Sequence, residues 1–170
     1  RLGFAVDTLL MDAVPGSASA LVWPGVAAQE VIIIGGGGAN AVTAAYALIK
    51  RLSSESGRRE FHVMVSNVTS EREGRIVCGN VARVARRYLQ VSLDFVGHVP
   101  PDDKMWHAAS MRLPVVAAFP TAAAAESFRR LAQVIIASPR AEYDGSGFDD
   151  FMRNLIQSSR VHIAAVQISP

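Results

Sequence analysis

Polar side chains that could do chemistry follow two apolar runs of the sequence. Asp12 comes directly after the apolar run at residues 6–11. A carboxylate at the end of a buried strand can orient water around Mg²⁺ or sense a γ-phosphate. The same Asp could instead cap the turn that begins at Ala13-Val14-Pro15-Gly16. Local sequence leaves both interpretations open.

A run of four glycines, Gly35 to Gly38, follows the apolar residues 31–34. Bare glycine N–H groups can cradle a phosphate. The Walker pattern needs a Lys and a Ser or Thr after its last glycine, and no Gly-Lys-Ser/Thr occurs in the chain. The G-x-G-x-x-G spacing fails as well, because Ala41 stands at its last position. The run therefore predicts a strand-to-helix turn.

Asn67 ends a third apolar run, at residues 61–66. Its amide could donate to and accept from an adenine edge, although an Asn at this place is more often a turn former. The four histidines show no zinc-binding spacing, and no serine lies in a G-x-S-x-G elbow. Cys78 is predicted to be a buried, inert thiol within a helix.

Composition favours a globular protein of one domain. The chain has 170 residues, of which 50% are hydrophobic and 19% charged. Its net charge is only +2, and its paired arginines are scattered among acidic residues, so a nucleic-acid partner is not expected. A single cysteine excludes an internal disulfide framework and favours a reducing compartment. No apolar run approaches the roughly 20 residues of a membrane span.

Hydrophobic periodicity places strands and helices in alternation. Strands are predicted at residues 6–11, 31–34, 61–66 and 93–97, and helices at residues 41–52, 72–89, 103–111 and 121–136. The apolar positions of the second helix are Ile76, Val77, Val81, Val84, Ala85, Tyr88 and Leu89. Thr121 is a predicted N-cap of the last helix, whose inward residues would be Phe128, Leu131, Ala132, Ile135 and Ile136.

This alternation predicts an α/β fold with a mostly parallel sheet flanked by helices. Function in such sheets gathers in the loops after the carboxyl ends of the strands, which begin here at Asp12, Gly35, Asn67 and Val99. The domain would occupy residues 1–140, with a linker at 141–147. Residues 148–170 would form a carboxyl-terminal amphipathic helix and tail, whose apolar face comprises Phe148, Phe151, Met152, Leu155 and Ile156.

Taken in order, these segments resemble the MinD/ParA family of P-loop ATPases, most closely the FleN/FlhG regulators of flagellar number. Residues 6–16 are similar to the family's D-[ST]-x-[AP]-G switch segment. The other matching segments are residues 27–34, 44–50, 61–68, 93–102 and 115–120. The resemblance covers roughly residues 6–136 and implies the carboxyl-terminal part of a SIMIBI-type P-loop NTPase fold.

The resemblance also implies roles for individual residues. Asp12 would be the switch aspartate, near Mg²⁺ through a bound water. Asn67 would contact the adenine base, and Pro100 and Asp102 would line the base or ribose side. The cofactors implied are ATP or ADP with Mg²⁺. The reaction implied is ATP hydrolysis, which gates formation of a homodimer.

The chain departs from the family pattern on the phosphate side. The family's lysine-rich phosphate loop would lie before Arg1, and the chain's start at Arg1 suggests a fragment, a processed chain or a misplaced gene start. Ala13 stands where the switch motif has a hydroxyl. Without the loop, a triphosphate has no lysine and no Ser/Thr–Mg²⁺ anchor, so this chain is expected to bind no cofactor or to be inactive alone.

Two functions remain open. The first is a FleN/FlhG-like regulator that acts through protein contacts, with ATP hydrolysis lost or dependent on an amino-terminal half. The second is a fragment of an active MinD-like ATPase that cycles on and off the membrane. The partners implied are a flagellar GTPase, switch-complex components or a transcriptional activator. The tail at Phe148 to Ile156 could contact a membrane, the domain or a partner, and the predicted location is the cytoplasm or the inner membrane surface.

Overall fold

A computed structural model describes residues 10, 12 and 30–137 of the chain. It contains a three-stranded parallel sheet in the order β1-β2-β3. The strands are β1 (Ile32–Gly36), β2 (Glu60–Ser66) and β3 (Ser92–Val99). The helices are α2 (Ala39–Ser56), α3 (Glu71–Leu89), α4 (Asp103–Ser110), α5 (Val115–Ala118) and α6 (Ala123–Ala137). The predicted α/β class with a parallel sheet and flanking helices is confirmed.

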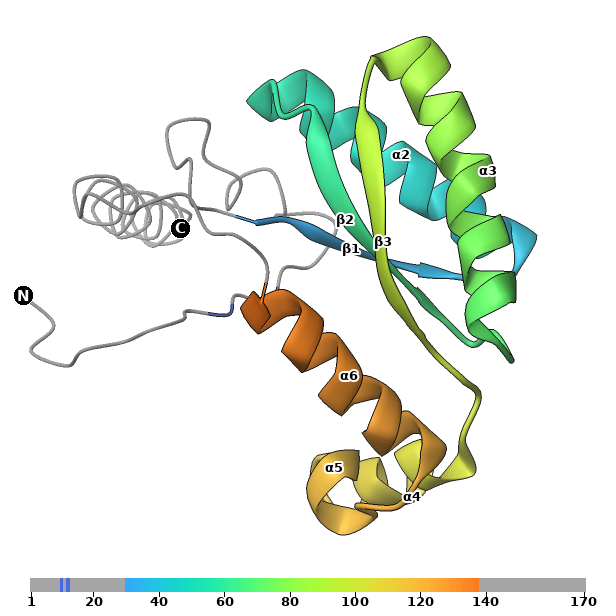
Figure 1. Cartoon of the computed structure of the whole chain (residues 1–170), viewed down its shortest axis with the longest axis vertical. Helices are drawn as coiled ribbons and strands as arrows, with labels where there is room; N and C mark the ends of the chain where they lie inside the picture. The colour runs from blue at the N-terminus through green and yellow to red at the C-terminus, as the bar shows by residue number, and fades with distance from the viewer. Residues whose placement is uncertain (1–9, 11, 13–29, 138–170) are drawn as a thin grey trace, which may run out of the picture.

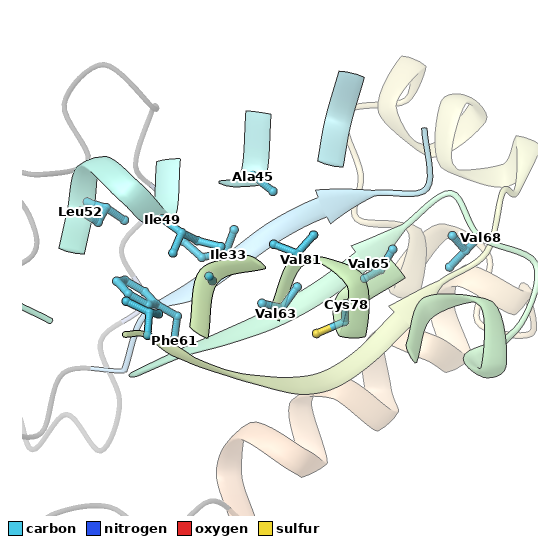
Figure 2. Close-up of a cluster of buried hydrophobic side chains, with 12 residues drawn as sticks. Ile33, Ala45, Ile49, Leu52, Phe61, Val63, Val65, Val68, Cys78 and Val81 are labelled. Atoms are coloured by element: carbon cyan, nitrogen blue, oxygen red, sulfur yellow. The ribbon is translucent and has the colours of Figure 1, made fainter. Parts of the chain in front are cut away.

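Helices α2 and α3 lie together over one face of the sheet (Figure 1). Every second residue of β2 points toward them, and this alternation buries Phe61, Val63 and Val65. Ile49 and Leu52 of α2 reach the same cluster, which Figure 2 shows in close-up. This cluster is the main core of the described residues, and it fixes the positions at which the strands end.

Helix α6 packs on β3, where its Leu131 meets Val99, Val96 and Met64 in a separate cluster. Helices α4 and α5 join the amino-terminal part of α6 in a third cluster around Ala108, which lies beyond the end of β3 (Figure 1). The pairing of β2 with β3 shifts after Val63, so that Val96 has no partner and Gly97 lies opposite Met64. A bulge of this kind bends the strand and redirects its end.

Several predicted inward residues are exposed, which corrects the sequence analysis. Ile76, Val84 and Tyr88 of α3 expose 56%, 41% and 66% of their surface, because the residues that face the sheet are Gly74, Cys78, Val81 and Ala85. In α6, Ala132 and Ile136 are exposed as well. Contact with β3 and with α5 buries α6 at Ala124, Ala125, Ser127 and Leu131, and its last turn lies beyond them.

Cys78 is buried between α3 and the sheet, as predicted. Burial raises the pKa of its thiol, and the charge of Asp94 raises that pKa further. A thiol held in its neutral form is a poor nucleophile. None of the helices within residues 30–137 combines the length and the apolar character needed to cross a bilayer.

Candidate functional site

Three loops meet at the carboxyl edge of the sheet, the first of them formed by the glycine run. Gly37 donates its N–H to the Ser66 carbonyl over 3.3 Å, and the Ser66 hydroxyl donates to the Gly35 carbonyl over 2.9 Å. A Cβ on Gly36 would lie 2.9 Å from Cβ of Ala41, and one on Gly37 would lie 2.7 Å from Cγ1 of Val68. These two glycines let the strand-to-helix turn pack closely on its neighbour, which supports the turn interpretation.

Asn67 forms the second loop, directly after β2. Its backbone is in the left-handed region with φ of 57°, and its N–H donates to the Val99 carbonyl over 2.8 Å. Asn tolerates this conformation better than most residues, so the turn-forming role is satisfied. Its side chain is exposed at the edge and able to contact a ligand. Both interpretations of Asn67 are therefore compatible with its position.

The start of α3 holds a capping box that the sequence analysis missed. The Glu73 N–H donates to the Ser70 hydroxyl over 3.2 Å, while the N–H and the hydroxyl of Thr69 each donate to Oε2 of Glu73 over 2.8 Å. These bonds, the one from the Thr69 backbone first, lower the pKa of Glu73. The S-x-x-E spacing was a visible signal. The box fixes the loop that carries Asn67.

Asp102, in the third loop, caps two helices at once. Its Oδ1 accepts the Lys104 N–H over 2.9 Å at the start of α4, and its Oδ2 accepts the Ala124 N–H over 3.0 Å at the start of α6. The predicted N-cap at Thr121 is thus wrong, because α6 begins at Ala123 and its first turn is capped by the carboxylate of Asp102 from a distant loop. These bonds, the one from Ala124 first, lower the pKa of Asp102.

Asp102→Ala is expected to lower the melting temperature at neutral pH, because two helix starts lose their acceptor. A carboxyl whose folded pKa is depressed contributes stability above its unfolded pKa of about 3.9 and loses it as the pH falls through the folded value. Melts of the variant and the wild type should therefore differ at pH 7 and converge in strong acid. Asp103→Ala, in the same helical turn, is the matched control. A difference that is the same at both pH values would contradict the capping role.

The structure brings three of the four predicted site residues to one edge. Pro100, half-buried, follows Val99, whose carbonyl accepts the Asn67 N–H, and Asp102 lies two residues further on. Asp12 is exposed and belongs to no helix or strand. Within the described part of the chain, no hydrogen bond or ion pair joins Asp12 to the other three residues. The predicted nucleotide roles of all four stay predictions.

The remaining predictions concern residues that the structure does not describe. The strand at residues 6–11, apart from the exposed Leu10, and the linker at 141–147 lie outside the described residues. The same holds for the apolar face of the tail, formed by Phe148, Phe151, Met152, Leu155 and Ile156.

The edge offers contacts for a nucleotide base and lacks the phosphate clamp of the family. The exposed Asn67 amide can pair with a base edge, and the Asp102 carboxylate has lone pairs left for a ribose hydroxyl. Helix α2 begins here at Ala39, and the preceding Gly38 provides no side-chain cap, so the first N–H groups of the helix carry partial positive charge. No Gly-Lys-Ser/Thr is present to bind phosphate and Mg²⁺. Among the described residues, no three His, Cys, Asp or Glu side chains gather as a metal site.

Comparison with known proteins agrees with the resemblance drawn from the motifs. The chain is 31% identical over 152 residues to the antiactivator FleN of Pseudomonas aeruginosa. The match covers 89% of this chain and 54% of FleN, so the chain spans about half the length of this relative. No family model matches the sequence. With its parallel α/β fold and its motifs in the predicted order, the chain is similar to FleN over most of its own length, in agreement with the resemblance to the MinD/ParA family.

Proposed function

We propose that this chain regulates flagellar number or placement through protein–protein contacts. The observation that carries the proposal is the similarity to FleN over most of the chain. An antiactivator, by its name, opposes an activator, and the simplest way to do so is to bind it. The partner of this chain would be a transcriptional activator, a flagellar GTPase or a switch-complex component. It would act in the cytoplasm or at the inner membrane surface.

The chemistry of the candidate site favours contacts over turnover. A nucleoside triphosphate carries about four negative charges, which P-loop ATPases neutralise with a lysine and Mg²⁺. This polypeptide has no such lysine motif. ATP hydrolysis is lost in this chain or depends on a segment beyond it. The nucleotide-base site would then be retained at Asn67, Pro100 and Asp102, without groups that bind or cleave the phosphates.

Calorimetric titration of the purified chain with ATP and Mg²⁺ tests the loss of nucleotide chemistry. We expect no saturable binding at concentrations below about 1 mM, since a contact from the base alone supplies less than the roughly 4 kcal/mol that this affinity requires. Adenosine is the matched ligand without phosphates, and it should give the same weak signal. Micromolar binding of ATP that adenosine does not reproduce would instead favour the fragment of an active ATPase.

The regulatory role can be tested in the cell by deleting the gene and counting flagella by electron microscopy. Loss of an antiactivator should raise the number of flagella per cell, and the intact gene on a plasmid should restore it. An unchanged number and position of flagella would contradict the proposed function.

A further inference from the structure

The carboxyl-terminal ends of α2 and α3 lie at the opposite end of the sheet from the candidate site (Figure 1). The last turn of α3 carries Arg86 and Arg87. A shallow depression of about 340 Å³ lies between the two helix ends. Lys50, Arg59 and Tyr88 are among the residues that line it. We call this depression, together with Arg87, whose guanidinium lies 5.5 Å from the Tyr88 ring centre, and Arg83 one turn earlier on α3, the α2–α3 basic surface.

Positive charge on this surface is not balanced locally. Residues 76–93, which include most of α3, hold three arginines and no Asp or Glu. No acidic residue lines the depression. The nearby acids are engaged elsewhere, because Glu55 pairs with Arg51 at 4.0 Å and Glu60 acts on Arg58. Uncompensated charge in a concave surface concentrates ligands of the opposite sign.

Two of the side chains that line the depression are a hydrogen-bonded Arg59 and an exposed Tyr88. Arg59 donates from Nη1 to the Ser53 hydroxyl over 3.0 Å and to the Leu89 carbonyl over 2.9 Å, so its guanidinium is held in place. Tyr88 exposes 66% of its surface, and the Arg87 guanidinium lies 5.5 Å from its ring centre. Exposed Tyr and Arg side chains held in fixed positions are the types that dominate protein interfaces.

Apolar side chains extend the surface along α3. Ile76, Val84 and Tyr88 recur at intervals of eight and four residues, and Arg83 and Arg87 lie between them on the solvent side. Their exposure is the departure from the predicted core noted above. A face that alternates apolar and cationic groups matches a partner that alternates apolar and acidic groups.

We propose that the α2–α3 basic surface binds an acidic segment of a partner protein. One apolar or aromatic side chain of that segment would enter the depression beside Tyr88. Its carboxylates would contact Lys50, Arg83 and Arg87. The proposal deepens the proposed function, on which its biological role rests, by naming the docking surface and the chemistry of the partner.

Two other occupants fit the observations less well. A second copy of this chain would need an acidic patch, but four of the described acids are used within the chain: Glu71 pairs with Arg75, Glu126 with Arg130, and Glu73 and Asp102 cap helices. An anionic bilayer would meet the arginines through its headgroups, but it offers no apolar side chain to occupy the depression beside Tyr88. A peptide segment offers one.

Fluorescence anisotropy with synthetic peptides tests the docking surface. The probe is a short labelled peptide of Asp and Glu residues around one central Phe, with one counterpart that carries Asn and Gln and another that carries Ala in place of Phe. The purified chain should bind the probe about tenfold more tightly than the neutral counterpart. Arg83→Glu combined with Arg87→Glu should remove that preference. Tyr88→Ala should remove the preference for Phe over Ala while keeping the preference for acid.

The matched control is Arg112→Glu combined with Arg130→Glu, which changes the net charge equally at exposed positions near the other end of the molecule. Circular dichroism checks that every variant is folded. An equal loss of binding in the control would show nonspecific charge attraction and overturn the proposal. Binding to phosphatidylserine vesicles without peptide binding, or self-association that Arg83→Glu with Arg87→Glu abolishes, would overturn it as well. If the peptides do not bind, the flagellar count still tests the proposed function. If the flagellar count does not change, the peptide titration still tests the docking surface.

Discussion

Phe61→Ala is expected to lower the free energy of unfolding by about 3–5 kcal/mol, the usual cost of removing a buried aromatic ring from a core. Phe61 is 1% exposed and lies among Ile49, Leu52 and Ile33 in the cluster between the sheet and its two covering helices (Figure 2). Urea denaturation followed by circular dichroism measures the change. Because β2 ends at the candidate site, the loop that carries Asn67 should loosen with it.

Trp106→Ala is the matched control for the loss of an aromatic side chain. Trp106 is 81% exposed on α4, so its removal should change the free energy of unfolding by no more than about 0.5 kcal/mol. A loss of less than about 1 kcal/mol in Phe61→Ala would mean that the neighbouring side chains fill the space of the ring and leave no cavity. Such a result would contradict the packing described for this core.

Gly97→Ala is expected to destabilise the protein by about 2–4 kcal/mol, for two separate reasons. The glycine has φ of 152°, a conformation that residues with a Cβ rarely adopt. A Cβ there would also lie 2.7 Å from Cδ2 of Leu131, which packs on β3 from α6. The glycine therefore allows both the bulged strand and the close approach of the helix. Denaturation curves of the variant and the wild type give the difference.

Gly79→Ala makes the same chemical change with the opposite expected sign. Gly79 is exposed within α3, and a Cβ there would meet no heavy atom within 4 Å. Alanine should stabilise this helix by about 0.5–1 kcal/mol. In a Leu131→Ala background, Gly97→Ala should destabilise the protein less. The clash with the Leu131 side chain is then gone, while the strain of the backbone conformation at position 97 remains. Equal costs in both backgrounds would refute the steric part of the explanation.

The sequence by itself determined the order and type of the elements. Short β-branched runs alternate with segments of helical period, and such local patterns depend only on which face of each element is apolar. Within residues 30–137 the structure has the predicted strands and helices within a few residues of their bounds, with Asn67 directly after β2 and Cys78 buried in α3, and it adds the short helix α5. Parallel pairing followed from the same alternation, since a helix must return the chain to the same edge. The resemblance to FleN/FlhG regulators rested on these segments in their order.

Only the tertiary structure decided how wide each buried face is and which distant groups meet. Helical period marked Ile76, Val84 and Tyr88 as apolar, yet neighbouring elements cover α3 along Gly74, Cys78, Val81 and Ala85 alone. The reach of Asp102 to the start of α6 spans 22 residues, and no local pattern encodes such a contact. The bulge at Val96 and the need for glycine at position 97 arise where α6 crosses β3. Burial, and capping between residues far apart in the sequence, depend on which surfaces the whole chain brings together. The periodicity of the sequence reports only which face of each single element is apolar.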